Sequence, residues 1–159
     1  MDIKILDYAP HLAKHFERLN KEWLIKYFDI EPVDQRIFDD QEAEIIRKPG
    51  FILFAKSKGE VVGTGAIIKS GCKWELIKMA VNDQYQSQGV GRIIASRLIE
   101  KAQSQGAQKI FIVTNTKLDK AIGLYLSLGF KIIHRGSHPK YQRGNLLMEL
   151  TITTSLMEQ

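Results

Sequence analysis

The apolar and polar residues of the chain follow two periods, one typical of strands and one typical of helices. Alternation, or a short apolar run bounded by turn residues, predicts strands at residues 2–8, 51–57, 60–70, 73–81, 109–114, 130–134 and 145–152. Helical spacing predicts one bent helix or two helices at 10–28, and further helices at 39–48, from Gly89 to near Gly106, and from Thr116 to Leu128. Thr116 and Asp119 have the spacing of a capping box for the last helix.

The order of these elements predicts the fold class. Three consecutive strands between residues 51 and 81 are joined by Lys58-Gly59 and by Gly71, which favours antiparallel pairing. One strand-helix-strand unit follows them. We therefore expect an α+β fold with a mixed, mainly antiparallel sheet of about seven strands flanked by helices. No repeat or linker divides the chain, so residues 1–159 are expected to form a single domain.

Charge, apolar segments and cysteine content indicate which kinds of partner and which cellular location to expect. The net charge of +5 comes from basic residues scattered among acids, which predicts only a mildly basic surface. No segment approaches the roughly 18 apolar residues that cross a bilayer, and no basic region precedes an apolar run at the start. We therefore expect a cytoplasmic protein. The single cysteine, Cys72, is expected to be a small apolar filler, and no metal site is expected.

Two glycines one residue apart, Gly89 and Gly91, open the long helix directly after a strand and a polar loop. Amides in the first turn of a helix lack internal partners and lie at the positive end of its dipole, so this position suits an anion. A nucleotide P-loop needs four residues between its glycines and then a lysine, whereas Arg92 follows here. A dinucleotide fingerprint needs a small residue where Ile94 stands. Neither nucleotide-binding loop fits.

The pattern Gln86-x-x-Gly89-x-Gly91 resembles the acetyl-CoA pyrophosphate loop of the GNAT acetyltransferase superfamily. The segment AIGLYLSLGF at 121–130 is similar to the second signature of that superfamily, Ala-x-x-Leu-Tyr-x-x-x-Gly-Phe, and the resemblance covers residues 75–130. It implies a GNAT-like fold of the small, single-domain bacterial type, with acetyl-CoA as co-substrate.

The resemblance also implies which residues bind the donor. A strand would hold the pantetheine arm through its backbone, with one amide facing the thioester carbonyl, and the loop would bind the pyrophosphate. These residues are Met79, Ala80, Val81, Gln86, Ser87, Gln88, Gly89, Val90, Gly91 and Arg92. A solvated arginine is the alternative for Arg92. Many members carry an asparagine seven residues before the signature tyrosine, where this chain has Leu118, so Asn115 is assigned to that contact.

Two side chains are candidates for proton transfer. Tyr125 matches the signature tyrosine, which implies a general acid for the departing CoA thiolate, although its helical spacing also fits a core tyrosine. Alternation predicts that Glu75 and Met79 lie on the same, apolar face of their strand and that Lys78 lies on the other face. It matches the position of a base in some GNAT proteins. It could equally face solvent, or bind a cationic substrate without moving protons.

The acceptor site is expected between the N-terminal helices and the loop at 134–145. Candidate residues are Trp23, Tyr27 and Phe28, as a pocket wall or as core; Glu22, Glu31 and Asp34, which would suit an amine; and His134, Arg135, His138, Lys140, Tyr141 and Arg143 of the basic loop. That loop could bind a carboxylate or a nucleic acid, and a solvated loop is our expectation.

The predicted function is N-acetyl transfer from acetyl-CoA to a primary amine of a small molecule or amino acid, by direct attack in a ternary complex. The alternatives are a protein or peptide N-acetyltransferase, and a non-catalytic acyl-CoA-binding sensor or partner-binding module. We expect no membrane or nucleic-acid partner. Related folds often dimerise, so the prediction is compatible with a homodimer.

Overall fold

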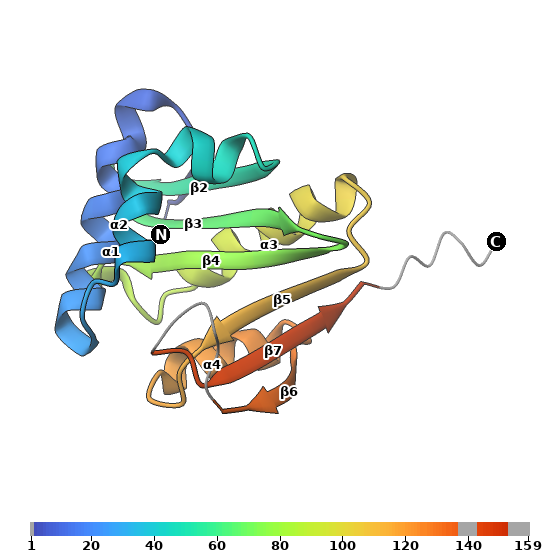
Figure 1. The fold of residues 1–159 in the computed structure, drawn as a ribbon. Helices are drawn as coiled ribbons and strands as arrows, with labels where there is room; N and C mark the ends of the chain where they lie inside the picture. Colours follow the sequence, from blue (N-terminus) through green and yellow to red (C-terminus); the bar gives the residue numbers. More distant parts are fainter. Residues whose placement is uncertain (1, 137–142, 153–159) are drawn as a thin grey trace.

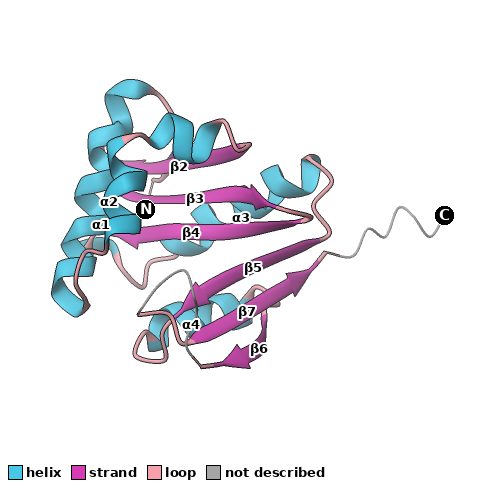
Figure 2. Ribbon diagram, viewed as in Figure 1, coloured by secondary structure: helices cyan, strands magenta, loops and turns pink. Residues whose placement is uncertain are grey.

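The computed structural model describes residues 2–136 and 143–152, which form one sheet with helices on both faces (Figure 1). The strands are β1 (Lys4–Asp7), β2 (Gly50–Ser57), β3 (Glu60–Ser70), β4 (Lys73–Val81), β5 (Lys109–Thr114), β6 (Lys131–Arg135) and β7 (Leu146–Thr151). The helical segments are η1 (Pro10–Leu12), α1 (Ala13–Tyr27), α2 (Pro32–Asp39), the π-helical turn η2 (Glu42–Ile46), η3 (Asp83–Tyr85), α3 (Val90–Ser104) and α4 (Asp119–Ser127). Figure 2 colours helices, strands and loops differently.

The seven strands follow the order β1-β2-β3-β4-β5-β7-β6. Every neighbouring pair is antiparallel except β4 and β5, whose parallel pairing needs the crossover that α3 provides. The predicted α+β fold with a mixed, mainly antiparallel sheet is confirmed. Lys58 and Gly59, with φ of 52° and 80°, form the predicted tight turn between β2 and β3.

Each face of the sheet carries its own apolar core. Helices α1 and α2 cover β2, β3 and β4, and Phe16, Phe38 and Phe54 belong to the buried apolar cluster on this side. Helices α3 and α4 cover the opposite face, with Ile94 and Leu98 of α3 fully buried. Because β4 lies between the two cores, its backbone is held from both sides.

A bulge interrupts the alternation of β4. Gly65 of β3 lies opposite two residues of β4, Lys78 and Met79, and Lys78 has a left-handed φ of 57°. This conformation costs a non-glycine residue about 1–2 kcal/mol. The extra residue puts Ile77 and Lys78 both on the α1–α2 side, while Met79 faces α3. The prediction that Glu75 shares a face with Met79 and lies opposite Lys78 is therefore wrong: Glu75 and Lys78 lie on the same side.

Helix α2 is absent from the elements predicted by spacing, which place a helix at 39–48 instead. The structure has α2 over Pro32–Asp39 and only the short π-helical turn over Glu42–Ile46. Pro32 at the first position and a capping box between Glu31 and Asp34 start α2. These signals are present in the sequence, but the helix is only 8 residues long and shows little more than two turns of apolar periodicity.

Two local predictions are also wrong. Helix α4 begins after Leu118, which makes no side-chain cap, and Thr116 Oγ1 instead accepts a hydrogen bond from Asn145 Nδ2 at 3.3 Å. Cys72 is exposed in the turn between β3 and β4 rather than buried. The end of α4 is as predicted, because Gly129 follows it with a left-handed φ of 101°.

Candidate active site

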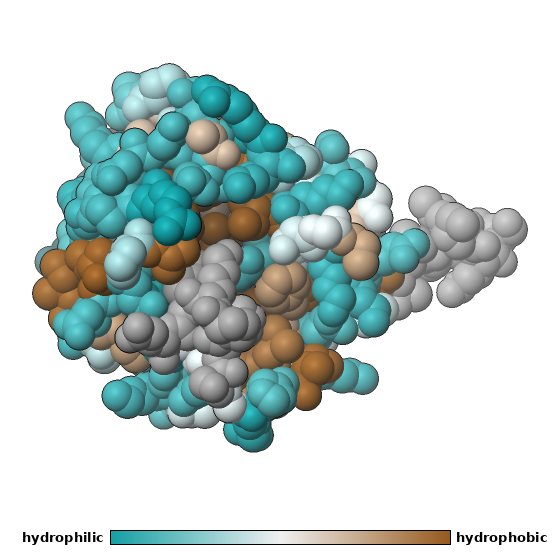
Figure 3. All heavy atoms as spheres, viewed as in Figure 1, coloured by the Kyte–Doolittle hydropathy of each residue, from teal (hydrophilic) through white to brown (hydrophobic). Residues whose placement is uncertain are grey.

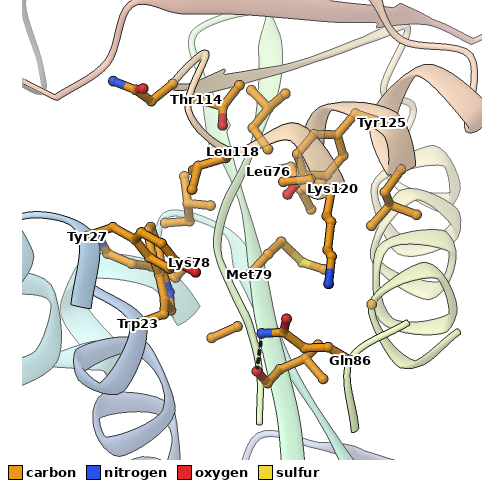
Figure 4. Close-up of a pocket in the computed structure, with 18 of the residues that line it drawn as sticks. Trp23, Tyr27, Leu76, Lys78, Met79, Gln86, Thr114, Leu118, Lys120 and Tyr125 are labelled. Atoms are coloured by element: carbon orange, nitrogen blue, oxygen red, sulfur yellow. Dashed lines mark hydrogen bonds between the residues drawn. The ribbon is translucent and has the colours of Figure 1, made fainter. Parts of the chain in front are cut away.

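A cavity of about 820 Å³ opens between β4 and β5 (Figure 4). These parallel strands pair only at Trp74 with Ile110 and at Glu75 with Phe111. Beyond these pairs the strands separate, and residues 75–81 and 112–115 line the opening. The end of α1, the start of α3 and the start of α4 complete the wall. A concave, largely apolar space with a few polar groups is the usual form of a small-molecule site.

The loop after β4 and the first turn of α3 form one end of the cavity. Gly89 caps α3 in the left-handed region, with φ of 86°, and Gly91 lies in the first turn. The first-turn amides have no partner within the helix and lie at the positive end of its dipole. This end of the cavity therefore suits a phosphate or another anion.

Glutamine side chains hold this loop together. Gln86 Nε2 donates to the Val81 carbonyl at 3.3 Å and to Asp83 Oδ1 at 3.2 Å, and Gln88 Nε2 donates to the Gln84 carbonyl at 3.1 Å. The predicted donor-binding residues that line the cavity are Met79, Ala80, Val81, Gln86, Ser87, Gly89, Val90, Gly91, Arg92 and Asn115. Gln88 is not among the described lining residues, and its side chain folds back onto the loop instead.

Two basic side chains lie near the α3 end of the cavity. Arg92 Nη1 donates to Ser127 Oγ at 2.6 Å, which ties the start of α3 to the end of α4. Lys120 is a site residue that the motifs do not identify; Figure 4 shows its ammonium group reaching into the cavity toward Gln86. The sequence did carry a signal for it, because a cation in the first turn of a helix is poorly placed against the dipole.

The structure brings the two predicted proton-transfer residues to the same cavity. Tyr125 is 4% exposed, and its ring meets Phe130 edge to face with centroids 5.8 Å apart. Burial raises the pKa of the Tyr125 hydroxyl, so this group keeps its proton at neutral pH. Glu75 is 2% exposed and lies where β4 and β5 part. The lining of the cavity thus includes the protonated hydroxyl of Tyr125 and the carboxyl group of Glu75.

Asn115 lines the cavity, but hydrogen bonds within the protein occupy its side chain. Its Nδ2 donates to the Arg143 carbonyl at 2.6 Å, and its Oδ1 accepts from the Lys117 amide at 2.8 Å. Leu118, at the position of the family's usual asparagine, also lines the cavity and precedes α4. Asn115 therefore fixes the segment before β7 against the end of β5.

An aromatic wall lies at the other end of the cavity, where α1 ends. Trp23, Tyr27 and Phe28 all line it, and the rings of Trp23 and Phe28 meet edge to face at 6.1 Å. Lys117 Nζ lies 5.8 Å from the centroid of Phe28. Figure 3 shows apolar surface beside this end of α1, where Ile25 is 68% exposed. Of the two alternatives for these residues, pocket wall or core, all three line the cavity, and Trp23 also packs against the α1–α2 core.

A buried ion cluster lies behind this wall. Asp34 is fully buried and binds Lys78 Nζ through Oδ1, while Arg143 donates to Oδ1 at 2.7 Å and to Oδ2 at 2.8 Å. Arg143 also donates to Glu31 Oε2 at 2.8 Å. Burial acts to raise the pKa of Asp34, but hydrogen bonds from Arg143 and the charge of Lys78 lower it to about 2. Glu31 and Asp34, which were expected to suit an amine, bind cations of the protein.

The basic loop at 134–145 falls into parts with different surroundings. His134 and Arg135 lie on β6 and are exposed, and Arg143 belongs to the ion cluster. His138, Lys140 and Tyr141 lie outside the described residues. Glu22, the third acid expected to suit an amine, pairs with Arg18 on the surface.

Residues 2–136 and 143–152 contain no group of three or more His, Cys, Asp and Glu side chains that could hold a metal ion. No helix within those ranges has both the length and the apolar character needed to cross a membrane.

Comparison with known proteins identifies the family. The model of the acetyltransferase (GNAT) family matches residues 14–130. The chain belongs to this family. It is 28% identical to acetyltransferase ECA0875 of Pectobacterium atrosepticum over 102 residues, which cover 62% of this chain and 72% of that protein. It is 34% identical to N-acetyltransferase 8 of Rattus norvegicus over 83 residues, but these cover only 48% of this chain and 37% of the rat protein.

Solved structures share the fold at lower identity. A GNAT-family acetyltransferase from Staphylococcus aureus superposes with a TM-score of 0.86 at 22% identity, over 96% of this chain and 100% of that one. The putative acetyltransferase yncA of Salmonella typhimurium, solved with its cofactor acetyl-CoA, gives a TM-score of 0.77 at 19% identity, over 97% and 96% of the two chains. The expected GNAT fold is confirmed, and the protein is an acetyltransferase of this family by sequence and by fold.

Proposed function

We propose that this GNAT protein is an N-acetyltransferase that moves an acetyl group from acetyl-CoA to the primary amine of a small molecule or amino acid. One observation carries the proposal: a single cavity joins the anion-binding start of α3 to Tyr125, to Glu75 and to the aromatic wall. Donor and acceptor can therefore lie in it together, which supports direct attack within a ternary complex. The acetyl-CoA carried by the Salmonella relative supports the choice of donor.

The donor is assigned to the α3 end of the cavity. The first-turn amides of α3, with Gln86, Ser87 and Arg92 around them, would bind the pyrophosphate. The backbone of residues 79–81 lies past the last pairing of β4 with β5. Its polar groups on the β5 side, apart from the Val81 carbonyl that accepts from Gln86, would therefore hold the pantetheine arm. Gln88 and Asn115 would act indirectly, by shaping the loop and the wall.

Acetyl-CoA supplies an activated thioester, and the residues of the cavity supply proton transfer and charge stabilisation. Glu75 would take one proton from the ammonium form of the acceptor, directly or through water, which frees the lone pair of the nitrogen. As the nitrogen then bonds to the carbonyl carbon and the carbon–sulfur bond breaks, the nitrogen would lose its second proton to water. Tyr125 would give its proton to the sulfur and regain one from solvent. A backbone amide among residues 79–81 would donate to the carbonyl oxygen, a type of contact worth about 3–4 kcal/mol in other enzymes.

The position of Cys72 supports direct transfer over an acetyl-enzyme. It lies in the turn that precedes β4, and it is not among the described residues that line the cavity. A cysteine nucleophile would have to reach the thioester within hydrogen-bonding range of a base.

An amine panel tests the proposal most directly. The protein would be mixed with acetyl-CoA and individual amines, amino acids and short peptides, and the released CoA thiol would be trapped with a chromogenic reagent. We expect thiol release above the acetyl-CoA-only background with a subset of small amines. Release with peptides alone would favour a protein acetyltransferase. Tight acetyl-CoA binding without release from any acceptor would favour the sensor and contradict the proposal.

The role of Glu75 has its own readout. If Glu75 removes the amine proton, Glu75→Gln should lower turnover most at low pH, where the acceptor is mainly ammonium. The defect should shrink as the pH approaches the pKa of the acceptor itself. A defect of the same size at every pH would indicate substrate binding rather than proton transfer.

A further inference from the structure

The bulge in β4 lies where the cavity begins and where both cores meet. The last pairing of β4 with β5 is at Glu75, three residues before Lys78, whereas β4 pairs with β3 on both sides of the bulge. Lys78 and Met79 both line the cavity. The conformation of the bulge therefore sets the direction of the backbone amides on this part of the cavity wall.

On the α3 side, packing holds the bulge. A Cβ built on Gly65 would lie 2.3 Å from Met79 Sδ, so the methionine occupies the space that a side chain on β3 would need. This contact places Met79, but it does nothing to offset the unfavourable left-handed conformation of Lys78.

On the α2 side, an ion pair holds the bulge. The Lys78 side chain is 3% exposed, its Nζ binds Asp34 Oδ1, and it lies 5.6 Å from the centroid of the Phe38 ring. Asp34 and Phe38 both belong to α2. The left-handed residue is thus attached to a different layer of the molecule, in a site where ionic contacts are stronger than on the surface.

Asp34 is itself fixed from two further directions. Its Oδ2 accepts from the Glu31 amide at 2.8 Å in the capping box of α2. Arg143, which precedes β7, donates to both of its oxygens. A bidentate arginine contact fixes both the plane and the position of a carboxylate. Lys78 therefore binds a carboxylate that is already held in place.

We propose that Asp34 and Lys78 are positioning residues for acyl transfer, whose buried ion pair holds the β4 bulge and thereby aims the backbone amide that polarises the thioester carbonyl. The inference rests on the proposed function, which places the thioester against residues 79–81. It goes further because Asp34 is not among the described lining residues of the cavity and would act only through Lys78.

The test measures the carbonyl directly. Acetyl-CoA labelled with ¹³C at the thioester carbonyl is bound to the wild type, Lys78→Met, Lys78→Gly and the control Lys69→Met. Lys69 is an exposed lysine of the neighbouring strand β3. Glycine at position 78 accepts the left-handed φ without strain, so that variant separates loss of the ion pair from a failure to fold. Coenzyme A affinity is measured by calorimetry and folding by thermal unfolding.

We expect the wild type and Lys69→Met to shift the carbonyl resonance downfield and Lys78→Met to lose most of that shift. Lys78→Gly should lose less of it, because glycine accepts the left-handed φ without the ion pair. For Lys78→Met, coenzyme A affinity should stay within about twofold, while turnover with any active amine falls about tenfold or more. A folded Lys78→Met variant with a wild-type carbonyl shift would overturn the inference. Failure of the wild type to bind acetyl-CoA would overturn the proposed function itself, which is a different result.

Discussion

Tyr125 is a buried phenol whose pKa is raised by its surroundings, so at neutral pH it holds a proton that it can donate. Tyr125→Phe removes only the hydroxyl and keeps the ring contact with Phe130. We expect turnover to fall about 100-fold, with coenzyme A affinity and thermal stability close to wild type. Steady-state kinetics beside calorimetric binding would measure both. Turnover within twofold of wild type would remove Tyr125 from the acid role.

Lys120 offers a second test on a single side chain, this time of donor binding. Its ammonium group reaches into the cavity near the loop assigned to the pyrophosphate. Lys120→Gln should raise the Kd of coenzyme A about fivefold to tenfold, or about 1 kcal/mol. The exposed Lys131 of β6 provides the matched control, Lys131→Gln. Equal affinities for the two variants, measured by calorimetry at one salt concentration, would place Lys120 outside the donor site.

Among the secondary-structure elements, those with local signals could be predicted and those that depend on distant partners could not. The strands and the glycine-led helix α3 follow from alternation and spacing over a few residues. The bulge in β4 does not follow from the sequence pattern, because regular alternation with a period of two gives no sign that Lys78 adopts a left-handed φ. The ion cluster was equally hidden: Arg143 reaches Asp34 across 109 positions of the sequence. The end of the cavity at the start of α3 could therefore be predicted from the sequence, whereas the ion cluster behind the other end could not.

The start of α3 gives a prediction for two glycines with different roles. Gly89 has a left-handed φ of 86°, so Gly89→Ala should lower stability by about 1 kcal/mol. Gly91 is helical, and an added Cβ would make ordinary contacts, 3.4 Å from Leu124 Cδ2 and 3.7 Å from Val81 Cγ2. Gly91→Ala should therefore raise stability by about 0.5–1 kcal/mol.

Thermal unfolding separates the two glycine variants. A change of 1 kcal/mol corresponds to a shift in Tm of about 2–4 °C for a chain of this size, in opposite directions for the two. Coenzyme A affinity should drop for Gly89→Ala, since the first turn of α3 must move to relieve the strain. Two variants with the same Tm would show that φ at position 89 does not limit the start of the helix.

Across the whole molecule, Asp34 links the α1–α2 layer, the central strand β4 and the segment before β7. Because the carboxylate must be ionised to bind both cations, the attachment of these parts depends on pH.

Acid unfolding tests this link. The pKa of Asp34 falls from 3.8 to about 2 on folding, so the unfolded chain binds the proton more readily. The stabilisation is fully present above about pH 5, where it amounts to about 2 kcal/mol, and is lost as the pH falls from about 4 toward 2. Asp34→Asn should lower stability at pH 6 by about 3–5 kcal/mol, because Lys78 and Arg143 lose their shared carboxylate.

Asp34→Asn should also make the free energy of unfolding less dependent on pH. Between pH 4 and 2.5 the wild type should lose stability faster than Asp34→Asn, by up to about 1.1 kcal/mol per pH unit, which corresponds to about 0.8 of a proton. Urea unfolding at a series of pH values measures this slope, and Asp2→Asn, at the exposed start of the chain, is the control that should keep the wild-type slope. If Asp34→Asn retained that slope, the buried carboxylate would not be the group whose protonation separates the layers, because the proton taken up on unfolding would have to bind elsewhere.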